Sequence, residues 1–127
     1  MATRTELSLR LQNTAGALAR VCKVLADEHV NVLALSVEGG GLLRMVVDNH
    51  VHAAGALREH QYAVEQRDVL SVQMSNGPGA LEAVARLLAD AGVNLDYVYG
   101  SAIEEQTMTT IVVGVPDAQR ASTAAGV

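Results

Sequence analysis

The strongest constraint on the fold of this chain is an internal repeat. The stretch "NTAGALARVCKVLADEHVN" at residues 13–31 returns as "NGPGALEAVARLLADAGVN" at residues 76–94, displaced by 63 positions. Over 22 aligned positions from Leu11, ten residues are identical in the second copy: Asn13, Gly16, Ala17, Leu18, Val21, Leu25, Ala26, Asp27, Val30 and Asn31. Such a repeat indicates one structural unit used twice. A unit of about 60 residues is marginally stable alone. We therefore predict two docked units, residues 1–67 and residues 68–127.

Each copy opens with the pattern of a strand followed by that of a helix. Apolar residues first alternate with polar ones, as in a strand with one wet face; they are Leu7, Leu9 and Leu11 in the first copy and Leu70, Val72 and Met74 in the second. After a short loop, apolar residues recur at the spacing of one helix face; they are Leu18, Val21, Cys22 and Leu25, then Leu81, Val84, Ala85 and Leu88. Cys22 is therefore expected to be a small buried residue.

The rest of the first copy completes a recognisable order of elements. Two β-rich runs, "VLALSVE" and "LLRMVVD", flank three glycines that predict a hairpin tip. A helix fits "HVHAAGALREHQ", and "YAVEQRD" fits a closing strand. This βαββαβ order predicts an α+β, ferredoxin-like fold. The second copy has a hairpin around residues 104–106 but ends in "DAQRASTAAGV", which suits a helix and not a strand. We expect the second unit to lack its last strand and to leave an open sheet edge.

Composition argues against several classes of function. The net charge is −5, and the chain has neither Trp nor Phe, so nucleic-acid binding lacks its electrostatic and aromatic components. No apolar run is long enough to span a membrane, and no signal peptide is evident. Together with the single cysteine, this favours a cytoplasmic protein. His50, His52 and His60 lack a suitable third ligand, so no metal or other cofactor is expected. No motif of an enzyme is visible.

The loop before each repeated helix has chemistry suited to a small zwitterion. The first backbone N–H groups of a helix have no partners and carry the positive end of its dipole, which favours a carboxylate. Gly16 and Gly79 leave the backbone accessible, and Pro78 suits a helix start. Asn13 and Asn76 each offer donors and an acceptor. A purely structural role remains an alternative. Asn is a common N-cap, which would explain Asn13 and Asn76, and Asn is common in turns, which would explain Asn31 and Asn94.

The two segments "LQNTAGALARVCKVLADEHVNV" and "MSNGPGALEAVARLLADAGVNL" together resemble the ACT domain, a small-molecule regulatory module of amino-acid-metabolism enzymes. The second copy is the closer, since Asn76, Pro78, Gly79 and Leu81 match the typical loop of the family. The first copy has Ala15 where the family has proline. The resemblance covers most of the chain and implies a tandem ACT protein without a catalytic domain.

The resemblance also implies a ligand and its site. In serine-sensing members, the loop Asn and a second Asn after the helix contact an amino acid between two ACT units. Carried over, the predicted ligand-binding residues are Asn13, Thr14, Ala15, Gly16, Ala17, Leu18, Asn31, Asn76, Gly77, Pro78, Gly79, Ala80, Leu81 and Asn94. A pocket would take its loop from one repeat and its distal Asn from the other. Because Tyr97 and Tyr99 replace Ala34 and Ser36, we expect two unequal pockets.

A sensing role implies partners. We expect a free amino acid as effector, a homodimer, and an enzyme partner in trans. The alternative is a regulatory or assembly subunit that binds an enzyme without needing a ligand.

Overall fold

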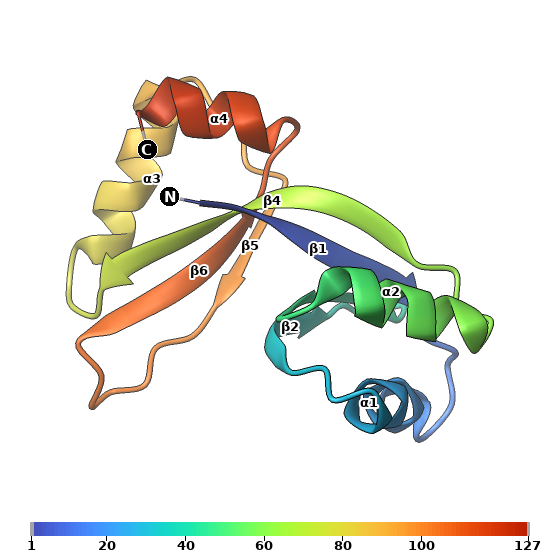
Figure 1. Cartoon of the computed structure of the whole chain (residues 1–127). Coiled ribbons are helices and arrows are strands. Elements are labelled where there is room, and N and C mark those ends of the chain that lie inside the picture. The colour runs from blue at the N-terminus through green and yellow to red at the C-terminus, as the bar shows by residue number, and fades with distance from the viewer. Residues whose placement is uncertain (1, 127) are drawn as a thin grey trace. The chain divides into compact units, whose positions relative to one another are not determined.

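A computed structural model describes residues 2–126 of the chain, and these divide into two compact units (Figure 1). The first unit is Thr5–Arg67, and the second consists of the residues from Asp68 onward together with residues 2–4. Strands β1 (Ala2–Arg10) and β4 (Glu65–Ser75) each contribute residues to both units.

The first unit has the predicted order of elements. After β1 come α1 (Ala17–Asp27), β2 (Val32–Val37), β3 (Leu42–Val47), α2 (His50–Glu59) and the start of β4. Its strands lie in the order β2-β3-β1-β4, and β3 pairs antiparallel with both β1 and β2. This is the ferredoxin-like arrangement, so the α+β prediction is confirmed. The predicted closing strand and the first strand of the second copy are one continuous strand of 11 residues, β4.

The second unit has a similar arrangement, but the strand segment at one edge of its sheet comes from the N-terminal end of the chain. It contains α3 (Ala80–Asp90), β5 (Tyr97–Gly100), β6 (Met108–Gly114) and α4 (Ala118–Ala125), with strands in the order β4-β6-β5. In the described part of the chain no strand follows β6, as predicted. The edge beyond β4 is not open, however, because β1 is the other neighbour of β4. Residues 2–4 thus occupy the place of the missing strand.

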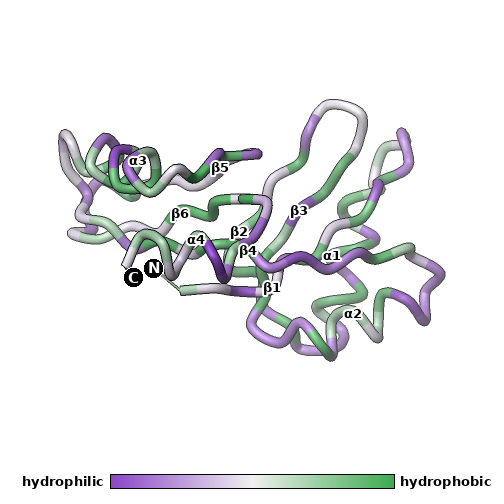
Figure 2. Tube along the Cα trace, turned by 90° about the horizontal axis from the view of Figure 1, so that it is seen from above, coloured by the Kyte–Doolittle hydropathy of each residue, from purple (hydrophilic) through white to green (hydrophobic). Residues whose placement is uncertain are grey.

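Each unit has its own apolar core between strands and helices. In the first unit, residues of β1, β3, α1 and α2 form one buried cluster that includes Leu7, Leu25, Met45 and Leu57. The second unit has a smaller cluster, drawn from β4, β6, α3 and α4. Figure 2 shows hydrophobic and hydrophilic residues interleaved along these elements, the pattern of amphipathic strands and helices.

The buried face of the two repeated helices differs from the predicted stripe. In α1 the buried residues are Ala17, Val21, Val24 and Leu25. Cys22 is exposed, so its predicted burial was wrong. In α3 only Leu88 is buried, and Leu81 is 53% exposed. Leu18 and Leu81, the first residues of the two predicted stripes, therefore stay at the surface, as single apolar residues often do.

Candidate functional site

The loop that ends β1 delivers the chain to the start of α1 without a side-chain cap. The cap position is Gly16, whose φ of 83° lies in the left-handed region that suits glycine, and no side chain bonds to the first turn. Asn13 is thus not the N-cap, which removes the structural alternative for this residue. The helix begins at Ala17, and the free backbone N–H groups of its first turn carry the positive end of the helix dipole.

The turn between β2 and β3 faces this loop. Gly41 has a φ of 90°, and its carbonyl accepts a 2.7 Å hydrogen bond from the backbone N–H of Leu11. A Cβ atom on Gly41 would lie 2.7 Å from the Leu11 carbonyl oxygen, which is too close for any side chain. The three-glycine hairpin tip is therefore confirmed. The lack of a side chain at Gly41 lets the turn approach the end of β1.

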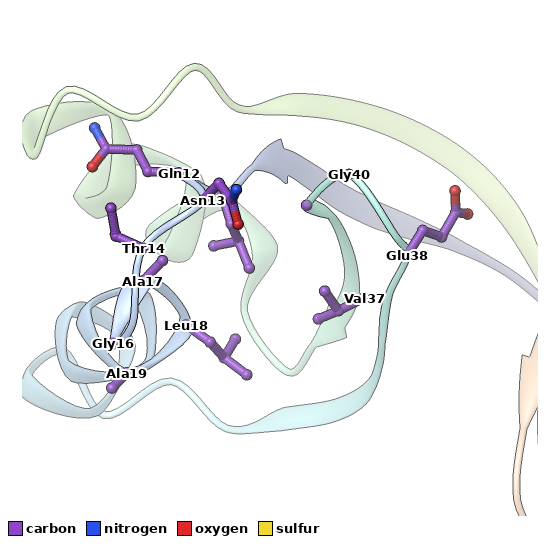
Figure 3. Close-up of a pocket in the computed structure, with 12 residues that line it drawn as sticks. Gln12, Asn13, Thr14, Gly16, Ala17, Leu18, Ala19, Val37, Glu38 and Gly40 are labelled. Carbon is purple, nitrogen blue, oxygen red and sulfur yellow. The ribbon is translucent and has the colours of Figure 1, made fainter.

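Loop and turn line an open cavity of about 720 Å³, which we name the loop cavity (Figure 3). It is lined by Leu11, Gln12, Asn13, Thr14, Gly16, Ala17, Leu18, Ala19, Val37, Glu38, Gly40 and Gly41. Figure 3 shows the Asn13 carboxamide between the loop and Gly40, with the apolar side chains of Leu18 and Val37 beyond it. The cavity thus combines polar side chains, Asn13 among them, with apolar ones.

Asn13 gives this wall a carboxamide that the fold leaves unused. It is exposed, and it makes no side-chain hydrogen bond to any described residue. The neighbouring polar groups are engaged, because Glu38 pairs with Arg44, and the Thr14 hydroxyl accepts a 3.0 Å hydrogen bond from Arg20. Asn13 therefore keeps two N–H donors and one carbonyl acceptor for a ligand.

The second copy of the loop has the same backbone but a different use for its asparagine. Gly79 has a φ of 85° and again precedes the helix without a side-chain cap. The Asn76 side-chain nitrogen, however, donates to the carbonyls of Ile103 and Gln106 at 2.9 and 2.8 Å. Its backbone N–H donates to the carbonyl of Thr107 at 2.9 Å. Asn76 thus fastens the β5–β6 connection, and both of its amide protons are occupied.

The distal asparagines lie at the far ends of the helices. Since α1 has 11 residues and a helix rises about 1.5 Å per residue, roughly 16 Å of helix separates the Asn13 end from the Asn31 end. The backbone of Asn31 is paired with Asp48, whose carboxylate accepts the Asn31 N–H at 3.0 Å. Asn94 lines a separate cavity of about 340 Å³ beside Asp117 and Arg120 of the α4 start. Neither unit brings its own two asparagines together.

The tyrosines of β5 do not line the described cavities. Tyr97 and Tyr99 stack, with ring centroids 6.2 Å apart. Tyr99 pairs in register with Val112, and Val112 is not among the residues of the apolar core beneath the helices. The two tyrosines therefore belong to the sheet face away from α3.

Two of the three candidate histidines, His52 and His60, form contacts within the fold. His52 Nε2 lies 3.1 Å from the Glu28 carboxylate, and His60 Nδ1 lies 2.9 Å from the Ala56 carbonyl. In residues 2–126 no group of three or more His, Cys, Asp or Glu is placed to hold a metal ion. Within the same range, none of the helices combines the length and the apolar character that crossing a membrane requires.

Sequence reasoning missed the wall of the loop cavity that comes from the β2–β3 turn. The missing residues are Val37, Glu38, Gly40 and Gly41. A signal was available, because in a ferredoxin-like sheet the third strand pairs with the first. That pairing brings the start of β3 beside the end of β1, where Arg10 pairs with Leu42.

Comparison with known protein families gives a match over residues 2–123 to the family described as the ACT domain pair. The chain belongs to the ACT domain pair family. The suspected resemblance and the tandem architecture are thereby confirmed. A search of proteins with curated functions gave no match.

Solved structures agree with this ACT domain pair assignment. Protein BT0572 from Bacteroides thetaiotaomicron is 30% identical, with a TM-score of 0.88, over 96% of this chain and 85% of that one. The ligand-free regulatory subunit of aspartate kinase from Thermus thermophilus is 18% identical, with a TM-score of 0.70, over 98% and 92%. The regulatory subunit of aspartate kinase from Thermus flavus is 17% identical, with a TM-score of 0.67, over 98% and 93%. At these lower identities, the two Thermus structures show a shared fold.

Proposed function

We propose that this ACT domain pair is a regulatory protein that binds a small free amino acid at the loop of the first unit, residues 13–18. The observation that carries the proposal is the unused Asn13 carboxamide beside an uncapped helix start in a cavity. The helix start attracts a carboxylate, and the carbonyl oxygen of Asn13 can accept a hydrogen bond from an ammonium group. Both charged groups of a zwitterion thus find a partner.

The dimensions and walls of the loop cavity support the same ligand class. Its volume of about 720 Å³ falls in the usual range for small-molecule sites. Leu18 is 36% exposed and Val37 is 45% exposed, so both offer apolar surface to a side chain of the ligand. Gly16 places no side chain between the ligand and the backbone of the helix start.

We further propose that the two repeats bind unequally. The side-chain N–H groups of Asn76 both donate hydrogen bonds within its own unit, so its loop has fewer free donors for a ligand than the loop of Asn13. The placement of the ligand between repeats, with Asn94 or Asn31 as the second asparagine, stays a prediction from the resemblance. Substituting each distal asparagine in turn tests which one contributes.

The regulatory role rests on the family and on the names of its relatives. The Thermus thermophilus structure is named as a regulatory subunit of aspartate kinase. By analogy, we propose a non-catalytic cytoplasmic protein that reports amino-acid occupancy to an enzyme in trans or to its own homodimer. A ligand that prefers one assembled state shifts the population towards it.

A ligand-independent assembly subunit is the second candidate, and one observation favours it. On β2, Leu33, Leu35 and Val37 are each exposed by 45% or more, along a strand at the edge of the sheet. Exposed apolar side chains on an edge strand suit contact with another protein. The edge beyond β4, which was expected to be open, is taken by residues 2–4.

The test is thermal unfolding of the purified chain with each of the twenty amino acids at millimolar concentration. We expect at least one of them to stabilise the protein, by about 2.7 kcal/mol when its concentration is 100 times its Kd. Asn13→Ala should abolish this stabilisation. Asn76→Ala is the matched control, and the stabilisation that the ligand adds should survive in it.

Two results would count against sensing. If no amino acid raises the unfolding temperature, the amino-acid proposal fails. If a partner enzyme co-purifies and its activity ignores every amino acid, the assembly subunit is the better description. Retained binding in Asn13→Ala would instead move the site away from this loop.

A further inference from the structure

The first unit has a second cavity, of about 320 Å³, which we name the arginine cavity. It lies beside the loop cavity, with which it shares Leu11, Gln12 and Ala17. Figure 3 shows the Gln12 side chain turned away from Leu18 and Val37, so Gln12 does not project into the apolar part of the loop cavity. Arg10, at the end of β1, and Arg20, in α1, line the arginine cavity but not the loop cavity.

The arginine cavity is positive in a protein whose net charge is −5. None of its described lining residues is acidic. Arg10 donates to the Gly40 carbonyl at 3.2 Å, and Arg20 donates to the Thr14 hydroxyl at 3.0 Å, so both bond to neutral oxygens. Within residues 2–126, neither guanidinium forms an ion pair. Each therefore keeps most of its five N–H donors and an uncompensated charge.

Two cations of the repeated helices have carboxylate partners. Lys23 pairs with Asp27 on α1, and Arg86 pairs with Glu82 on α3. The contrast matters because Lys23 lies on the same helix as Arg20, only three residues away. Within α1, Lys23 thus has a carboxylate partner, and Arg20 has none among the described residues.

Neutral polar groups complete the wall. His60 Nδ1 lies 2.9 Å from the Ala56 carbonyl, which can only accept, so this nitrogen carries a proton and Nε2 remains for a ligand. Tyr62, which is partly buried, lines the same cavity, and so does Gln61. The phenol O–H can donate a hydrogen bond to an anionic oxygen of a ligand, and Nε2 can accept one from a ligand hydroxyl. The wall can therefore bind a group that presents charged oxygens beside a hydroxyl.

The internal repeat shows that the fold does not require these arginines. At the displacement of 63 positions, Gln73 of β4 stands where Arg10 stands in β1, and Ala83 of α3 stands where Arg20 stands in α1. Strand and helix form in both copies. The strand and the helix therefore do not require the pair, which leaves the two arginines open to a role in binding.

We propose that the arginine cavity binds the phosphate group of a small molecule, a phosphomonoester or free phosphate. Two guanidinium groups match the charge of a phosphate dianion, and planar guanidinium groups bind its oxygens in pairs. A carboxylate would balance only one of them. The volume of about 320 Å³ accommodates the phosphate with a small organic group attached.

The experiment is calorimetric titration of the full chain with inorganic phosphate and with glycerol 3-phosphate, at constant ionic strength in chloride. The double variant Arg10→Gln and Arg20→Ala installs the residues of the second copy. We expect it to lose affinity by about tenfold or more, since hydrogen bonds to charged groups are among the strongest. Lys23→Ala removes the same kind of charge from the same helix and is expected to bind within about twofold of the parent, as an exposed pair contributes little.

The outcomes separate this proposal from amino-acid sensing. Asn13→Ala should keep its phosphate affinity, because Asn13 does not line the arginine cavity. Tighter binding of glycerol 3-phosphate than of phosphate would identify an ester as the ligand, and equal binding would identify free phosphate. Absence of binding, or an equal loss in Lys23→Ala, would overturn the proposal. If the double variant unfolds, Arg10→Gln alone provides the same comparison.

Discussion

The two repeats start their helices in the same way and use their asparagines differently. Gly16 and Gly79 have φ values of 83° and 85°, and each begins a helix of 11 residues. Yet Asn13 has no side-chain partner among the described residues, whereas Asn76 holds the carbonyls of Ile103 and Gln106. A duplicated sequence has thus kept its backbone while one copy took on a structural bond and the other stayed available.

The difference follows from the connections opposite the two loops. The connection between β2 and β3 is a short glycine-rich turn over residues 38–41, which leaves the loop cavity open beside Asn13. The connection between β5 and β6 covers residues 101–107 and is long enough to reach Asn76. The carbonyls of this longer connection then satisfy the carboxamide that a ligand would otherwise meet. The longer connection thus provides Asn76 with partners that the short turn does not provide for Asn13.

The largest expected effect compares the two cores. Leu25 of α1 and Leu88 of α3 occupy equivalent repeat positions, and each is 2% exposed. Replacing either by alanine should cost about 2–5 kcal/mol of unfolding free energy, because each leaves a cavity in a packed core. Leu81→Ala, at 53% exposure, should cost less than about 1 kcal/mol. Urea unfolding measures all three, and a large loss in Leu81→Ala would mean that the predicted helix stripe is buried after all.

The next effect tests the short turn itself. Gly41→Ala combines a φ of 90° with a contact of 2.7 Å to the Leu11 carbonyl, so we expect a loss of about 2–3 kcal/mol. Gly39 is the matched control, since a Cβ there meets nothing within 4 Å. Gly39→Ala should change the urea midpoint little. Equal behaviour of the two variants would show that the turn is not held against β1.

A smaller effect addresses the asparagines directly. Asn76→Ala should lower stability by about 1–2 kcal/mol, since it removes two hydrogen bonds to the β5–β6 connection. Asn13→Ala, measured without ligand, should change stability by less than about 0.5 kcal/mol. Thermal unfolding of both variants decides the matter. If Asn13→Ala proves the more destabilising, the assignment of structural and available asparagines is reversed.

The smallest effect concerns charged pairs on the two repeated helices. Lys23 with Asp27 and Glu82 with Arg86 are both exposed pairs four residues apart. Removing either pair should cost no more than about 0.5 kcal/mol. The measurement is the urea midpoint of Lys23→Ala and Arg86→Ala in low and high salt. A loss above 1 kcal/mol in one helix alone would show that this pair contributes more than its exposure suggests.

Much of the fold could be predicted because it depends on patterns local to the chain. Alternation and helical spacing located the strands and helices, and the repeat located the two helix starts. The buried helix face was less accessible, since Leu18 and Leu25 look alike in a stripe and only packing makes Leu25 the buried one. The partners of Asn76 could not be predicted, because they depend on the path of a connection that lies 27 residues or more further along the chain.

The position of residues 2–4 in the sheet could not be predicted either, because these residues show no apolar alternation. These residues lie beside β4 and belong to the second unit, although the rest of β1 belongs to the first. Cutting the chain after Arg67 would therefore separate the second unit from residues 2–4, which form the edge of its sheet next to β4. Because protein synthesis runs from the N-terminus, residues 2–4 can pair with β4 only after the whole first unit has been made. A fragment that begins at Asp68 should therefore gain stability when the fragment that ends at Arg67 is added, because that fragment carries residues 2–4.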